Sequence, residues 1–296
     1  MATPVTFELD VAADRHLWLA SAWDFCRRWP LGAIGAAVIV VMLLVAALAP
    51  LIAPYDPLAI DFAAMLAPPS RAHWLGTDSF GRDVLSRLIH GSRTALLVGF
   101  GASLLGATLG AIVGVGSAYF GGRIDLYLQR LMDILLAFPL IILALALVAI
   151  LGNSIPNLIM AIMVPMIPRC ALVIRASALS IREMPYVDSA RAAGFSHTRI
   201  VVRHMLPNVM APLLIMATAF VGQAILLESS LSFLGLGVQE PTAAWGLMLS
   251  GAAIDFAERA PWMAIFPGLA ISLAVFAFNL FGDSLRDALD PRLRTQ

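Results

Sequence analysis

Long apolar runs separated by short polar stretches make up most of the chain. A bilayer core of about 30 Å requires about 20 helical residues to cross it, and six runs reach this length. We therefore predict an all-α, polytopic membrane protein. Its six transmembrane helices should lie near residues 31–53, 94–119, 132–152, 155–175, 208–230 and 261–283.

The composition supports this prediction. The chain has 296 residues, of which 60% are hydrophobic and 13% charged, and its mean hydropathy is +0.88. These values are too apolar for a water-soluble domain of this length. The first run, 31–53, is longer than the apolar part of a secretory signal, so it should be a retained anchor. Cys26 and Cys170 are too few and too scattered to predict a disulfide framework.

The distribution of basic residues predicts the orientation. With the N-terminus in the cytoplasm, thirteen arginines fall in cytoplasmic segments and five outside, and Arg169 is left within a span. All 19 basic residues are arginine. A P-loop requires a lysine, so this chain should not bind ATP itself. The net charge of zero and the scattered arginines give no indication of nucleic-acid binding.

The most informative polar stretch, residues 186–208, lies between two apolar runs. Pro185 suits a first helical position, and Asp188 falls in the first turn, within reach of Arg191. Gly194 should end this helix, because glycine adopts the left-handed conformation at low cost.

A second short helix should follow. Ser196 is suited to cap it, and it should extend to about Met205. Leu206 and Pro207 should then let the chain turn back into the next apolar span. The product is a pair of short helices with small residues on the face available to another protein.

This segment resembles the coupling loop of ABC importer permeases, which has a Glu-Ala-Ala start, a glycine and a later Leu-Pro. The opening differs here, since Asp188 and Ser189 precede Ala190. The resemblance implies contact with a cytoplasmic ATPase through Asp188, Ala190, Arg191, Gly194, His204, Leu206 and Pro207. The alternative is a loop that only folds back on itself.

A second motif, between the first two spans, resembles the C-type permease of dipeptide, oligopeptide and nickel importers. It contains the signatures Leu-Gly-Thr-Asp, Gly-Arg-Asp and Leu-Ser-Arg. The predicted ion pairs are Asp83 with Arg87, four residues apart on a helix, and Asp78 with Arg82. Glycines should set the turns. These side chains either form a gate or docking surface or, as we favour, hold the shape of a cap; the candidates are Asp78, Gly81, Arg82, Asp83 and Arg87.

The stretch 227–249 resembles the same family's Ser-Leu-Ser-Phe-Leu-Gly-Leu-Gly signature, followed by Pro-x-x-x-Trp-Gly, and residues 266–294 resemble its C-terminal pattern. Glu228 is the notable residue, because a carboxylate in a span is costly and normally has a partner or a task. It could bind a peptide amino terminus. We favour instead a hydrogen bond to neighbouring backbone or a subunit contact.

The resemblance covers the chain from about residue 31 onward and implies the ABC type I importer permease fold. Residues 1–30 would be a cytoplasmic segment, forming either an interfacial helix or a tail. The first span would be followed by a periplasmic cap, 54–93. The five-helix core, 94–283, would carry the coupling loop 176–207, and 284–296 would be a cytoplasmic tail.

The same resemblance implies that the chain forms half of a di- or oligopeptide pathway in the bacterial inner membrane and is not itself an enzyme. Expected partners are a homologous permease, one or two P-loop ATPases that bind ATP and magnesium, a periplasmic or lipid-anchored binding protein, and membrane lipid. No metal or cofactor is expected in this chain. Nickel chelates, glutathione and opine-like compounds remain alternative cargoes.

Two other functional classes fit the sequence poorly. An ion-coupled carrier would usually show inverted repeats and ionisable residues at the midplane, whereas the two halves of this chain show no repeat and its carboxylates cluster at span ends. A membrane enzyme is disfavoured because neither HExxH nor GxSxG occurs. The five histidines do not have a metal-binding spacing.

Overall fold

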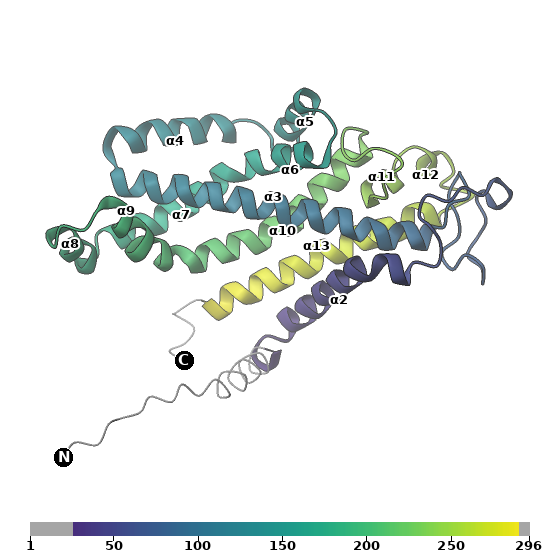
Figure 1. The fold of residues 1–296 in the computed structure, drawn as a ribbon, viewed down its shortest axis with the longest axis horizontal. Coiled ribbons are helices and arrows are strands. Elements are labelled where there is room, and N and C mark those ends of the chain that lie inside the picture. Colours follow the sequence, from purple (N-terminus) through teal and green to yellow (C-terminus); the bar gives the residue numbers. More distant parts are fainter. Residues whose placement is uncertain (1–25, 290–296) are drawn as a thin grey trace, which may run out of the picture.

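The computed structural model describes residues 26–289, which form helices and connecting loops without a β-strand in that range (Figure 1). Residues 1–25 of the N-terminal segment, for which an interfacial helix and a tail were the alternatives, lie outside the described residues, as does Asp290 in the predicted C-terminal tail.

Among residues 26–289, five stretches are long and apolar enough to cross a membrane, and a bent helix pair raises the number to six if it forms one span. The first begins beside Pro30, which suits the first turn of a helix. The helices of the five stretches include α2 (Pro30–Ile52), α3 (Val84–Phe120), α6 (Ile155–Met163), α7 (Ile167–Arg182), α10 (Met210–Phe233) and α13 (Trp262–Leu289). A 3₁₀ turn, Val164–Met166, joins α6 to α7.

The span predicted at 132–152 is present only as part of a sharply bent helix pair. Two helices, α4 (Gly122–Leu136) and α5 (Leu140–Leu151), meet there at 92° (Figure 1). Pro139 causes the break, because it has no N–H to donate and disfavours a helical conformation at the residue before it. Pro139 and the start of α5 line a pocket together with residues of α7 and α10.

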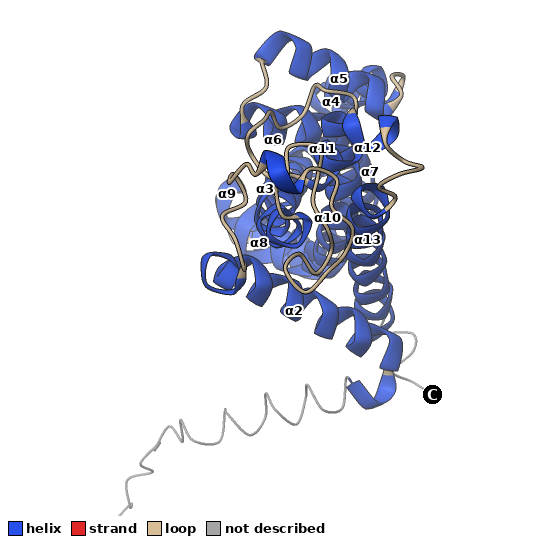
Figure 2. Cartoon of the chain, turned by 90° about the vertical axis from the view of Figure 1, so that its right-hand side faces the viewer, coloured by secondary structure: helices blue, strands red, loops and turns tan. Residues whose placement is uncertain are grey.

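Helix α3 starts ten residues earlier than the span predicted from the sequence and packs closely on α7. A Cβ placed on Gly110 would lie 2.5 Å from Cys170 Cβ, and one on Gly114 would lie 2.6 Å from the Ala171 carbonyl oxygen. Only glycine permits this approach, and the four-residue spacing of Ala102, Gly106, Gly110 and Gly114 in the sequence predicts such close helix packing. In Figure 2, α3 and α10 lie within the bundle, with α2 on one side and α4 and α5 on the other.

The polar segments gather at opposite ends of the bundle (Figure 1). One end carries α8 (Pro185–Ala192) and α9 (His197–Ile200), and α2 begins and α13 ends toward it. The other end carries the segment before α3, which includes the 3₁₀ turn Phe62–Ala64. The short helices α11 (Trp245–Leu249) and α12 (Ala252–Asp255) lie beside that segment.

Candidate functional site

Helix α8 forms the outer part of the predicted coupling segment. Pro185 occupies its first turn, as predicted, and Asp188 accepts a hydrogen bond from Arg191 at 3.0 Å on the exposed face. Val187 and Ala190, three residues apart, point into the core. Ala190 is 5% exposed, so its predicted place on a docking surface is wrong: it anchors α8 from within.

The helix ends at Gly194, where φ is +76°. The Phe195 N–H donates to the Ala190 carbonyl at 3.1 Å, and the Gly194 N–H donates to the Arg191 carbonyl at 3.0 Å. This pair of hydrogen bonds is the Schellman motif, which requires the left-handed conformation that glycine adopts most easily. No atom lies within 4 Å of a Cβ built at Gly194, so the surface around it is open.

The second helical segment reaches Met205, as predicted, but it is not α-helical throughout. The Ser196 side chain caps α9, but α-helical geometry stops at Ile200, where a π-helix, Val201–Met205, takes over. A 3₁₀ turn, Leu206–Val209, then leads directly into α10. The predicted reversal at Leu206 and Pro207 is therefore wrong. Proline in the first turn of a helical segment loses no hydrogen bond, so it need not break the path.

Two contacts attach this helix pair to the bundle. The Tyr119 hydroxyl at the end of α3 hydrogen-bonds His197 Nδ1 at 2.7 Å, and the Arg191 guanidinium lies over the Tyr119 ring, 5.6 Å from its centroid. His204 packs beneath the surface, with its ring stacked on Phe195 at 5.9 Å between centroids. The helix pair is therefore held to α3 through Tyr119, while its outer face stays exposed.

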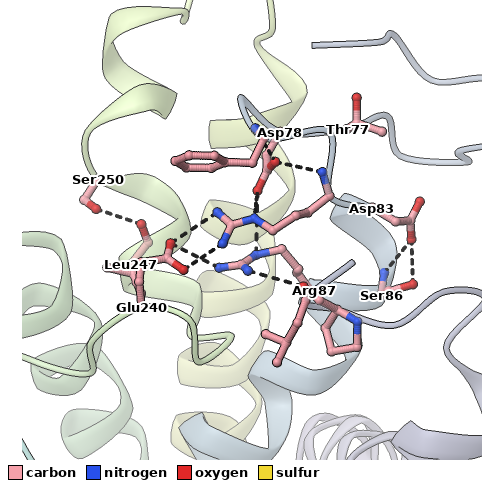
Figure 3. Close-up of polar contacts among 12 residues, drawn as sticks. Thr77, Asp78, Asp83, Ser86, Arg87, Glu240, Leu247 and Ser250 are labelled. Atoms are coloured by element: carbon pink, nitrogen blue, oxygen red, sulfur yellow. Dashed lines mark hydrogen bonds and ion pairs between the residues drawn. The ribbon is translucent and has the colours of Figure 1, made fainter. Parts of the chain in front are cut away.

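The opposite end contains a cluster of four charged residues (Figure 3). Arg82 lies between two carboxylates, with its Nε 2.6 Å from Asp78 Oδ2 and its Nη1 2.7 Å from Glu240 Oε2. Arg87 extends the cluster, with its Nη2 3.5 Å from Glu240 and its Nε 3.9 Å from Asp78. The predicted Asp78–Arg82 pair is confirmed. Two positive and two negative groups balance each other.

The four side chains of this cluster differ in how deeply they are buried. Arg87 is only 1% exposed, and the side chain of Glu240 is 47% exposed, so the cluster opens toward solvent at Glu240. Burial opposes the charged form of Arg82, but its hydrogen bonds and ion pairs with Glu240 and Asp78 outweigh that effect and raise its pKa. The cluster joins the segment before α3 to the loop after α10.

The predicted Asp83–Arg87 pair is wrong. Asp83 precedes α3 and caps it, accepting hydrogen bonds from the Ser86 N–H at 2.8 Å and the Ser86 hydroxyl at 2.7 Å. Its other oxygen lies 2.9 Å from His73 Nδ1. An N-cap side chain folds back over its own first turn, which turns it away from the residue four positions on.

Glycines set the turns of the cap, as predicted. Gly76 and Gly81 have φ values of +76° and +75°, and a Cβ at Gly81 would collide with the backbone of Asp61. Backbone hydrogen bonds such as Thr77 N–H to the Ala67 carbonyl and Asp78 N–H to the Arg82 carbonyl show that the segment before α3 has a defined fold.

Glu228 lies fully buried in α10, and its partners differ from those predicted. The Ser232 hydroxyl donates to it at 2.8 Å and the Ser229 hydroxyl at 3.3 Å. These hydroxyls take the place of the neighbouring backbone that we favoured. The alternative, a site for a peptide amino terminus, is wrong for this arrangement, because a carboxylate that is 0% exposed is out of reach of a ligand.

Two residues with important polar contacts, Glu240 and Asp125, were not predicted from the sequence. Glu240 is 158 residues from Arg82 in the chain, and no periodicity relates such distant positions. Asp125 of α4 accepts two hydrogen bonds from Arg175 of α7, at 2.7 and 2.6 Å, and so ties the two helices together. Such long-range pairs depend on tertiary packing, which only the structure gives.

No group of three or more metal-ligating side chains comes together within residues 26–289. His73 contacts Asp83, and His90 Nδ1 lies 3.0 Å from the Ser86 carbonyl oxygen. His73 and His90 thus both have partners in or next to the first turn of α3.

Comparison with known families agrees with this architecture. Residues 94–295 match the model of the binding-protein-dependent transport system inner membrane component, and residues 17–69 match the N-terminal transmembrane domain of oligopeptide transport permease C. The chain belongs to the binding-protein-dependent permease family. It is therefore a multi-pass membrane protein and a subunit of an ABC transport system.

Named relatives align with most of this permease. A putative peptide transport system permease protein of Brucella suis is 44% identical over 89% of this chain and 88% of its own length. The dipeptide transport system permease protein of Alkalihalophilus pseudofirmus is 43% identical over 93% and 90%. A glutathione transport system permease protein of Escherichia coli is 41% identical over 92% and 90%.

Proposed function

We propose that this permease forms half of the pathway by which a bacterial importer carries di- or oligopeptides across the inner membrane. The names of the peptide and dipeptide relatives support this cargo. The glutathione permease supports a related peptide as the alternative cargo.

We propose further that a homologous permease completes the pathway. One or two cytoplasmic P-loop ATPases would bind ATP and magnesium, and a periplasmic or lipid-anchored binding protein would deliver the cargo. This chain would need no cofactor and would catalyse no reaction. Its N- and C-termini and the α8–α9 pair would lie in the cytoplasm, an orientation that the distribution of arginines supports.

The observation that carries the proposal is the exposed helix pair around Gly194. The surface there is open, and the pair is fastened to α3 by the Tyr119–His197 hydrogen bond. A docked ATPase would push on α8 and α9, and packed helices would transmit the displacement along the bundle. In this reading Asp188, Arg191 and Gly194 form the contact surface, while Ala190, His204, Leu206 and Pro207 support it from within or behind.

The test compares Gly194→Trp with Gly194→Asn in the reconstituted transporter. Asparagine tolerates a positive φ better than other side-chain-bearing residues, so it controls for the backbone, whereas tryptophan adds bulk where the ATPase would dock. Gly194→Trp should lower peptide uptake at least about tenfold while the chain still inserts, and Gly194→Asn should retain at least about half of it. Normal uptake by Gly194→Trp would refute the coupling role. Co-purification with a second permease and ATPases, identified by mass spectrometry, checks assembly.

A further inference from the structure

Arg169 brings a positive charge into a membrane-spanning helix. It lies near the middle of the apolar stretch Ile155–Arg182, about 20 Å along the helix axis from either end at about 1.5 Å per residue. A charge at this depth is costly in lipid and is normally directed toward a partner or a water-filled pathway. We therefore expect the Arg169 side chain to have a partner or to face a water-filled pathway.

No partner for Arg169 exists within the part of the chain that the structure describes. Its side chain is exposed and makes no hydrogen bond or ion pair with residues 26–289. By contrast, Arg82, Arg87 and Arg175 all contact carboxylates. The charge of Arg169 is thus available to a group outside this chain.

Arg169 of α7 lines an open pocket of about 390 Å³ that Pro139 and the start of α5 border on one side and α10 on another. Gln223 and Ser230 of α10 contribute polar groups to the wall, and Leu226 and Leu227 contribute apolar ones. The Gln223 carboxamide has no hydrogen-bond partner among the described residues. The Ser230 hydroxyl donates to the Leu226 carbonyl at 2.8 Å, which leaves its oxygen free to accept a hydrogen bond. Two unused groups that can donate hydrogen bonds therefore face one space.

We propose that Arg169 and Gln223 form a transit site for the free carboxylate of a peptide cargo. A guanidinium group binds a carboxylate through two parallel hydrogen bonds, and a carboxamide can donate a third. Such bonds strengthen where water is scarce. The two leucines would contact the cargo's apolar side chains. The inference rests on the proposed peptide cargo, since dipeptides and glutathione all carry a free carboxylate.

The experiment uses the complete transporter with its binding protein in liposomes. Uptake is measured below saturation for a dipeptide and for the same dipeptide as its C-terminal amide, chosen so that the purified binding protein binds both. The variants are Arg169→Gln, Arg169→Lys and Gln223→Leu. Arg130→Gln is the control, because Arg130 is an exposed arginine on α4 that does not line the cavity. The binding protein is the same throughout, so a changed preference reports on the permease.

Arg169→Gln should reduce uptake of the free acid at least about tenfold and uptake of the amide less than about twofold. Gln223→Leu should shift the preference in the same direction by a smaller factor. Arg169→Lys should lie between Arg169→Gln and the unaltered protein, because it keeps the charge but loses the planar fork. The control should leave both rates unchanged.

Two results would overturn the transit site. Unchanged preference in Arg169→Gln would show that the cargo carboxylate does not meet this arginine. Equal loss of both substrates, together with loss of the second permease from the purified complex, would assign Arg169 to a contact between subunits. If the unaltered transporter carried no peptide at all, the proposed function would fail, and this inference with it.

Discussion

The two ends of the bundle use their charged side chains in opposite ways. At the cap, Asp78, Arg82 and Arg87 are buried and paired with one another or with Glu240. At the other end, the Asp188–Arg191 pair lies on an exposed surface. Buried charges must find partners inside the chain, whereas an exposed pair contributes little to the fold. The charged side chains of the cap thus stabilise its shape, whereas those of the helix pair are exposed and can contact another protein.

The largest effect should come from removing Asp78. Asp78→Ala would leave Arg82 and Arg87 with only the half-exposed Glu240 to balance them. Breaking a buried network in this way should lower the free energy of unfolding by about 3 to 5 kcal/mol. Thermal unfolding of the purified complex in mild detergent measures the loss.

Asp133→Ala is the matched control for that change, because it removes a carboxylate that is exposed and 3.9 Å from Arg130. It should change the free energy of unfolding by less than about 0.5 kcal/mol. Equal losses from the two substitutions would mean that the cap cluster contributes no more than a surface pair.

A smaller effect should follow from filling the α3–α7 interface. Gly110→Ala would place a Cβ 2.5 Å from Cys170 Cβ, and such overpacking costs about 1 to 3 kcal/mol. Gly116 lies on the same helix with nothing within 4 Å of its Cβ position. Gly116→Ala should be neutral or stabilising by up to about 1 kcal/mol, because alanine favours the helix. The two midpoints of thermal unfolding should therefore move in opposite directions or differ clearly; a common shift would contradict close packing at Gly110.

The smallest effect on stability should come from Asp188→Ala. Its ion pair with Arg191 is exposed and screened by solvent, so its loss should cost less than about 1 kcal/mol. If the helix pair docks an ATPase, the same variant should reduce transport more than it reduces stability. Thermal unfolding and peptide uptake on one preparation give both values. A stability loss as large as that of Asp78→Ala would remove the contrast between the two ends.

Local sequence signals predicted the local parts of these sites well. Backbone preferences of single residues explain Pro185 at the start of α8, Gly194 at its end and the Ser196 cap of α9. Such preferences can be recognised from the sequence alone. The same holds for the close α3–α7 packing, where four-residue spacing places the small side chains on one face.

The errors share a different cause. The continuous path through Pro207 depends on packing around a proline, and the sequence does not say whether that packing favours a break. Glu240 and Arg175 find their partners across long stretches of chain. Asp83 could either cap α3 or pair along it, and only the structure shows that capping prevails.

Helix α3 is unbroken for 37 residues and has a polar attachment at each end. Asp83 caps its start beside His73, and Tyr119 near its other end hydrogen-bonds His197. At about 1.5 Å per residue the helix is about 55 Å long, more than the thickness of a bilayer including its headgroups. The two surfaces of the membrane are therefore joined by one secondary-structure element. If α3 moves as a rigid rod, an axial shift or tilt imposed near Tyr119 also displaces Asp83 at its other end.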